Sequence, residues 1–297
     1  MKTAAALTNR NVKLFFRDKG MFFTSLATPL ILLVLYGTFL KNVYRDSFLA
    51  MMPEMILPSA NLVDALVASQ LMSSLLSVSC VTVAFCSNFL MVQDKANGTL
   101  KDLRISPVKH STLSVSYYLA TLICTLLVCL VATGVCLLYV ASVGWYLTAG
   151  DVAYIFLDVL LLVLFGTAIS SVINLFLSTQ GQISAVGSII SSVYGFICGA
   201  YMPISSFSTG LQKVVSFLPG TYGTALMRTH CMDSVLKEMQ IQGIPAEVIA
   251  ALRKTLDCNI SLMGSTVSVG GMYLILGGST AAFLGLYILL HHVKNKK

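Results

Sequence analysis

The stretch from Asn61 to Val92 reads NLVDALVASQLMSSLLSVSCVTVAFCSNFLMV and contains one charged residue, Asp64. It is longer than the roughly 20 apolar residues that cross a bilayer as a helix. Lipid offers the backbone no hydrogen-bond partners, so a spanning segment is a helix or part of a closed barrel, and a barrel would show short alternating strands. The stretch therefore predicts a membrane helix that tilts or extends beyond the bilayer.

Five further apolar runs flank this stretch, at residues 20–40, 113–141, 152–177, 182–201 and 266–290. The chain of 297 residues is 56% hydrophobic and 10% charged, whereas soluble domains are about 25% charged. We therefore predict an all-α integral membrane protein with six transmembrane helices, in which residues 1–297 form a single domain.

The charged residues are placed to orient such a protein. A net charge of +7 could indicate a nucleic-acid partner, but no Lys or Arg lies within an apolar run, and we expect none. The N-terminal segment, the loop after residue 92 and the C-terminal tail carry twelve Lys and Arg against three acids, while the other loops carry seven of each. The positive-inside rule then puts both termini in the cytoplasm of a multi-pass plasma-membrane protein.

The N-terminal segment predicts an amphipathic helix before the first span. Because the segment lacks the pattern of a cleaved signal, we expect the first span to be retained. Over residues 5–19, Arg10, Lys13 and Arg17 fall on one face, and Phe16 falls on another with further apolar residues. Such a helix would lie along the inner membrane surface. The alternative is a solvated basic anchor that only sets topology.

The loop after residue 92 contains GTLKDLRISPV, from Gly98 to Val108. A Gly before a helix-starting Thr99, leucines at 100 and 103, and Pro107 at the end predict a short cytoplasmic helix. Its surface mixes basic and apolar side chains. A helix of this kind suits a groove on a soluble partner.

The loop before the last span, residues 203–265, is too long for a simple connector. Residues 211–227 are moderately apolar and are interrupted by Pro219-Gly220, and residues 234–256 have a polar, helical pattern. We expect re-entrant or capping helices here. Cys231 and Cys258 flank the polar helix on the predicted outer side, where a disulfide can persist, so we predict a bond between them; two free thiols are the alternative.

Polar residues within the spans have two interpretations. Gln70, Ser73 and Ser77 either line a substrate path or allow close helix packing. Asp64 and Asp158 either bind a coupling ion or are hydrated from the outer surface. In the last span, glycines at 271, 278 and 285 predict a close helix contact.

The sequence shows no sign of a catalytic or metal site. It contains no G-x-x-x-x-G-K-[ST] motif to hold ATP, no H-E-x-x-H and no C-x-x-C pair. We therefore expect neither an enzyme, nor a metal site, nor a cofactor bound by this chain. The six cysteines within the apolar runs are expected to behave as small buried hydrophobes. Energy for any transport must come from a partner or from a gradient.

Three segments, taken in order, resemble the ABC-2 (type V) exporter permeases, which lack a fused nucleotide-binding domain. They are Arg17-Asp18-Lys19 before a span with Pro29-Leu30, the run from Gly98 to Val108, and GAYMP at 199–203 through LPGTY at 218–222 to Arg228. The resemblance covers nearly the whole chain. It departs at Ala96, Asn97 and Lys101, where family members often carry glutamates.

The resemblance implies a permease that works as a dimer with two ATP-binding cassette ATPase subunits, which bind the ATP and magnesium. The coupling helix that transmits ATPase closure would then comprise Gly98, Thr99, Leu100, Leu103, Arg104 and Pro107. Six spans are too few to enclose a sizeable path, so we expect a second copy or a homologous permease to meet this chain around spans one, two and five.

Three classes of function stay open at this point. The first is ATP-driven export of an amphipathic or hydrophobic substrate, such as a drug, lipid or peptide, out of the cytoplasm. The second is gradient-driven secondary transport, which needs ionisable groups within the membrane. The third is an integral membrane protein that does not transport. The missing P-loop and the coupling-like loop favour the first.

Overall fold

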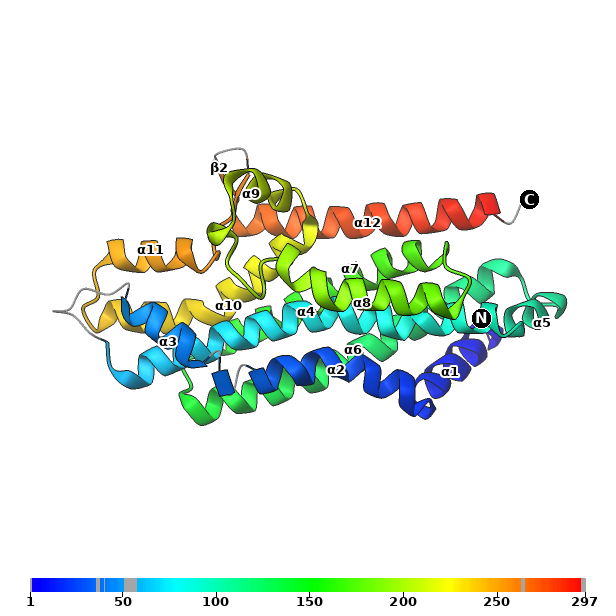
Figure 1. The fold of residues 1–297 in the computed structure, drawn as a ribbon, viewed down its shortest axis with the longest axis horizontal. Helices are drawn as coiled ribbons and strands as arrows, with labels where there is room; N and C mark the ends of the chain where they lie inside the picture. The colour runs from blue at the N-terminus through cyan, green and yellow to red at the C-terminus, as the bar shows by residue number, and fades with distance from the viewer. Residues whose placement is uncertain (1, 36–37, 40, 51–57, 263–264, 295–297) are drawn as a thin grey trace.

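The computed structural model describes residues 2–35, 38–39, 41–50, 58–262 and 265–294, and it describes no side chain for Arg104 or for residues 291–294. Helices run along the long axis of an elongated bundle (Figure 1). The start of α1 (Lys2–Arg17), the end of α12 (Val269–Lys294) and α5 (Thr99–Ile105) lie at one end, called the proximal end below. The opposite, distal end carries α3 (Lys41–Ala50) and α11 (Ala246–Thr255).

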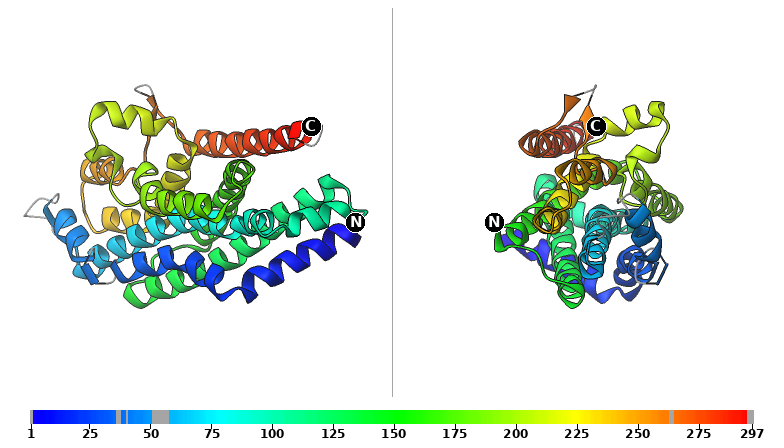
Figure 2. Two further views of the ribbon diagram at one scale, coloured as in Figure 1. Left: turned by 45° about the vertical axis from the view of Figure 1, so that its right-hand side comes forward. Right: turned by 90° about the vertical axis from the view of Figure 1, so that its left-hand side faces the viewer.

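The central element is α4 (Ala60–Ala96), whose most apolar 18-residue window is completely buried. Apolar and small polar side chains occupy its whole circumference, so neighbouring helices can pack against it from every side. These neighbours surround it in Figures 1 and 2: α2 (Lys19–Leu35), α6 (His110–Val143), α7 (Ala149–Asn174), α8 (Gln180–Ile197) and α10 (Pro219–Ile241). The long apolar stretch from Asn61 to Val92 is therefore the core of the bundle.

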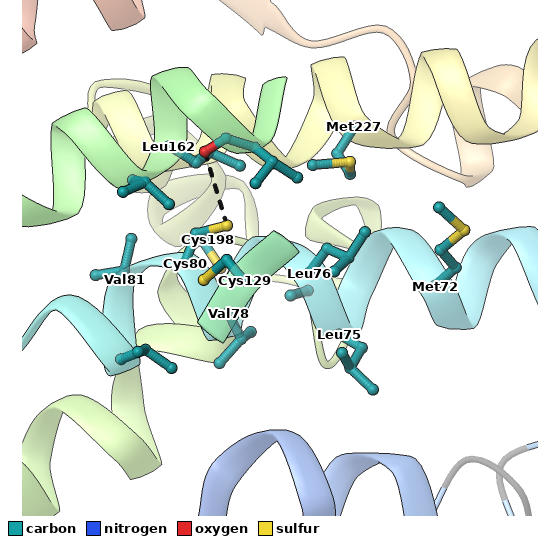
Figure 3. Close-up of a cluster of buried hydrophobic side chains, with 14 of the residues drawn as sticks. Met72, Leu75, Leu76, Val78, Cys80, Val81, Cys129, Leu162, Cys198 and Met227 are labelled. Atoms are coloured by element: carbon teal, nitrogen blue, oxygen red, sulfur yellow. Dashed lines mark hydrogen bonds between the residues drawn. The ribbon is translucent and has the colours of Figure 1, made fainter. Parts of the chain in front are cut away.

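Cysteines contribute to this core as apolar residues. Cys80, Cys129 and Cys198 lie among leucine, valine and methionine side chains at the centre of the bundle (Figure 3). The Cys80 thiol is 4.0 Å from the carbonyl oxygen of Val159 on α7. All six cysteines of the apolar runs are buried and free, which confirms that prediction.

Each predicted span corresponds to a helix, although the predicted end of the first, residue 40, lies outside the described residues. Within the described part, α4, α6, α7 and α12 are long and apolar enough to cross a membrane, and α1 with α2 forms a further candidate that is bent by 72°. The 18 residues of α8 include two glutamines and four serines, which lower its hydropathy. The chain is thus an α-helical membrane protein, and the count of six spans stays a prediction.

The long loop differs from its prediction. It forms η2 (Ile204–Ser206), α9 (Thr209–Ser216), α10, α11 and a hairpin of β1 (Ser261–Leu262) and β2 (Ser265–Thr266) before α12. The prediction of a single polar helix at 234–256 is wrong, because the helix is interrupted between α10 and α11, where Gly243 has a φ of 97°. Nor is α10 a surface cap: it packs against α4, α7 and α12.

The glycine contact predicted in the last span is also wrong. A Cβ at Gly278 or Gly285 would meet no described atom within 4 Å, and one at Gly271 would meet only its own segment. A close approach of one helix to the backbone of another occurs instead at Gly166 of α7, where a Cβ would lie 3.0 Å from the backbone of Cys80 and Val81. The short distance between α7 and α4 therefore depends on the lack of a side chain at Gly166.

The distal helices α10 and α11 are joined by an ion-pair cluster whose strength should depend on pH. Burial alone would raise the pKa of Asp233, but hydrogen bonds from Lys237 and Arg253 lower it below the ordinary 3.8. A lowered pKa contributes stability that is complete above the unfolded-state value and is lost as the pH falls through the folded-state value. We expect Asp233→Asn to cost about 0.5–1 kcal/mol at pH 7, since the pair is partly exposed.

In thermal unfolding, the difference between wild type and Asp233→Asn should shrink as the pH is lowered through 3.8. Asp46→Asn, at an exposed position of α3, serves as the control and should change little at either pH. A difference that stays constant with pH would contradict the assignment.

Candidate functional site

The proximal end carries the predicted coupling helix. α4 ends at Ala96, and Gly98 takes a φ of 82°, a left-handed conformation that favours glycine, before α5 begins at Thr99. Pro107 follows the helix, as expected. The predicted helix is therefore present, at the same end as the start of α1 (Figure 1).

The apolar residues of α5 divide between an inward and an outward face. Leu100 is buried in the core and Leu103 packs partly buried against it, so these two predicted contact residues face the chain's own interior. Ile105 is 85% exposed, beside exposed Lys101 and Asp102. The predicted coupling residue Arg104 has a described backbone in α5 but no described side chain. Ile105 is the residue that the sequence analysis missed, because the leucine spacing alone drew attention to the inward face.

The last turn of α4, which leads into α5 and is called the root of α5 below, is bonded to three other helices. Asp94 accepts hydrogen bonds from Arg10 of α1, at 3.0 Å, and from the Tyr117 hydroxyl of α6. The Lys95 ammonium donates to the carbonyl oxygens of Asn174, Leu175 and Leu177, at 2.9 to 3.2 Å. A cation is favourable there, because the last carbonyl groups of a helix point away from it and carry the negative end of its dipole. Force applied to α5 would thus reach α1, α6 and α7.

The predicted interface helix is present as α1. Phe15 is buried, Phe16 is 40% exposed, and Lys13 and Arg17 are exposed. Arg10 differs from the other basic residues because it is engaged in the ion pair with Asp94. The position of α1 against the inner membrane surface stays a prediction.

A groove runs between α2, α4 and α8. Its proximal part has a volume of about 630 Å³, its distal part about 490 Å³, and the two share Ser191 and Ser192 of α8. Ser184 and Ser188 continue the hydroxyl row, whereas α2 contributes mainly apolar side chains. The groove could therefore accept a molecule with both polar and apolar parts.

The predicted path residues Gln70, Ser73 and Ser77 do not line this groove. All three are fully buried within α4. The hydroxyls of Ser73 and Ser77 donate to the carbonyl oxygens of Gln70 and Ser73, one turn earlier, at 2.8 and 2.7 Å. Buried serines whose hydroxyls bond to their own helix are typical of close helix packing. This is the second of the two interpretations of these residues, beside a substrate path.

A buried ion pair between Arg228 and Asp257 is bonded to the segment that lines the distal end of the groove. Tyr201 lines the groove there, and its neighbours Gly199 and Ile204 are bonded to the pair. Arg228, 1% exposed, donates to Asp257 at 3.1 Å and to the Gly199 carbonyl, while Asp257 also accepts the Ile204 amide hydrogen. Burial raises the pKa of Asp257, and Arg228 opposes that shift.

The two carboxylates predicted within spans have separate partners. Asp64 lies near Lys41 and Arg45 of α3. Asp158 is fully buried, so the hydration proposed for it is wrong; its oxygens accept from Tyr273 at 2.7 Å and contact His230 Nδ1 at 2.6 Å. His230 is likewise buried.

The predicted disulfide is not formed. Cys231 and Cys258 are both free and are 0% and 1% exposed. Burial raises the pKa of Cys258 to about 12, and disulfide formation requires a thiolate. Both residues therefore act as small core side chains. Within the described residues, no group of three or more His, Cys, Asp or Glu is placed to hold a metal ion.

In a comparison with protein families, the model of the ABC-2 type transporter matches residues 3–230. The matched region includes α1, α5, the groove and Arg228. A search of curated proteins found no match. Because the family model covers more than half of the 297 residues, the chain belongs to the ABC-2 type transporter family.

Proposed function

We propose that this chain is the transmembrane permease subunit of an ATP-binding cassette exporter. The observation that carries the proposal is the exposed Ile105 on α5, a helix whose root at Asp94 and Lys95 is bonded to α1, α6 and α7. A separate ATPase subunit, with ATP and magnesium bound to it, would seat α5 in a groove and move these helices when it closes. Residues 1–297 would form one permease domain.

The groove between α2, α4 and α8 supports export of an amphipathic or hydrophobic substrate. A single chain leaves this groove open, so a second permease copy, identical or homologous, would complete the path by meeting α2, α4 and α8. The predicted orientation places α5 in the cytoplasm of a plasma-membrane exporter, where the ATPase is available. Gradient-driven transport has less support, because Asp64 and Asp158 have separate partners and no hydrogen bond or ion pair among the described residues connects the two carboxylates.

The coupling role of α5 is tested by replacing Ile105. Ile105→Asp is expected to reduce both ATPase retention by the tagged permease and ATP hydrolysis by the complex in lipid nanodiscs, each at least tenfold. A carboxylate buried in the contact would lack a partner. Leu103→Asp is less informative because Leu103 packs within the chain.

The matched control is Ile241→Asp, at a residue that is 78% exposed at the distal end of α10. This variant should retain the ATPase and its activity. Normal ATPase retention and hydrolysis with Ile105→Asp would exclude α5 as the coupling element, and equal losses in both variants would assign the effect to general destabilisation.

A further inference from the structure

Two cations share one carboxylate at the distal end. Lys41 Nζ and the Arg45 guanidinium lie 3.9 and 3.4 Å from the oxygens of Asp64. Lys41 and Arg45 are four residues apart on α3, so both project from the face that packs on α4, and each side chain is about one third exposed. The three groups together carry one excess positive charge.

Among the described residues, no other charged group pairs with Lys41 or Arg45 to cancel this excess. Asp46 follows Arg45 directly, and adjacent residues on a helix do not face each other. Asp46 is exposed and makes no ion pair within the described part of the chain. The cationic pair is therefore free to attract an anion from solution or from a membrane surface.

An apolar slot begins below this cationic pair. It has a volume of about 260 Å³ between α2, α4 and α6, and it is lined almost entirely by carbon atoms of Leu33, Leu71, Met72, Leu75, Val135 and Cys136. Its floor is buried, whereas Leu33 and Val135 at the rim are 38% and 47% exposed. Tyr139 lines the slot and lies within electrostatic range of Asp64, which connects the slot to the cations.

The dimensions match one leaflet of a bilayer. Leu71 lies seven residues beyond Asp64 on α4 and Leu75 eleven residues beyond, or about 10 and 16 Å at 1.5 Å per residue. Half of the roughly 30 Å hydrocarbon core is about 15 Å. With the cations at the level of the lipid headgroups, the slot would therefore lie at the depth of the acyl chains of the same leaflet.

We propose that this site binds one anionic phospholipid, with its phosphate at Lys41 and Arg45 and one acyl chain in the slot. Arg and Lys are the side chains that recognise phosphate in basic pockets between membrane helices. The slot uses the face of α2 that carries Leu33, away from the groove lined by Thr28 and Ile31, so the lipid would not compete with a substrate. A bound lipid would fix α3 against α2 and α6.

The test is native mass spectrometry of the purified chain with equimolar phosphatidylglycerol, phosphatidylcholine and soluble glycerol phosphate. Wild type is expected to retain phosphatidylglycerol about tenfold better than phosphatidylcholine, and Arg45→Gln should remove most of this preference. Val135→Trp should fill the slot and reduce retention of phosphatidylglycerol, although it leaves the cations intact. Lys213→Gln, at an exposed position of α9, is the charge-matched control and should behave as wild type.

The wild-type competition does not depend on any variant folding correctly. Equal retention of anionic and neutral phospholipids by wild type would overturn the proposal. So would binding of soluble glycerol phosphate as strong as that of phosphatidylglycerol, because the slot would then contribute nothing. Unchanged retention with Val135→Trp would place the lipid elsewhere.

Discussion

Replacing Arg228 with methionine is expected to destabilise the protein by about 3–5 kcal/mol, the cost of leaving one member of a buried ion pair without its partner. The remaining carboxylate, Asp257, is 6% exposed, and the carbonyl oxygen of Gly199 would lose its donor as well. In thermal unfolding of the detergent-solubilised protein, the midpoint should fall by on the order of 10 °C.

Two comparisons separate the buried charge from loss of the arginine side chain. Arg253→Met removes an arginine from a pair with Asp233 whose side chains are 25% and 22% exposed, so its effect should be about 1 kcal/mol or less. Adding Asp257→Asn to Arg228→Met should recover much of the loss, because asparagine tolerates the positive φ of 51° and keeps an acceptor for the Ile204 amide. Similar losses in Arg228→Met and Arg253→Met would show that burial of the pair does not matter.

Replacing Gly166 with valine is expected to separate α7 from α4 and to cost about 3 kcal/mol. A Cβ at Gly166 would already lie 3.0 Å from the Cys80 carbonyl oxygen and the Val81 Cα, and 3.1 Å from the Ala84 Cβ. Backbone atoms cannot move aside as a flexible side chain can, and extra carbons in a packed core cost about 1–3 kcal/mol. Gly166→Ala should cost less, since alanine recovers about 1 kcal/mol of helix propensity.

Gly278→Val is the matched control, because this α12 residue is exposed and a Cβ there would meet no described atom within 4 Å. Its unfolding midpoint should lie close to that of wild type, with a change of about 0.5 kcal/mol or less. If Gly166→Val unfolds at the wild-type temperature, the close contact between α4 and α7 does not hold the bundle together.

The membrane helices could be predicted because the signal for them is local. An apolar run of sufficient length is a property of consecutive residues, so α4, α6, α7 and α12 were found without knowledge of their neighbours. The short helix after Gly98 was found for the same reason, since its start and stop residues are adjacent in the chain. The leucine spacing in that helix was real, but it marked the face packed on the core.

Predictions about partners failed where they depended on residues far apart in the chain. Cys231 and Cys258 flank a polar segment in the sequence, yet both are separate buried thiols. The repeated glycines of the last span look like a contact stripe, but the close approach to a neighbouring backbone is at Gly166 of α7. Asp158 looked solvated from its position near a span end, and its partners His230 and Tyr273 come from 72 and 115 residues away.

Apolar length and charge placement are local properties of each segment, so they suffice to identify a helical membrane protein and to predict that its termini and short loop helix share one side of the membrane. The tertiary structure alone decided that Ile105 is the exposed apolar residue of α5, that α8 presents its serines to a groove, and that Arg228 is paired with Asp257. Which side chains meet depends on how helices rotate and pack against one another. That arrangement minimises buried unpaired charge and empty space over the whole bundle, so no single segment encodes it.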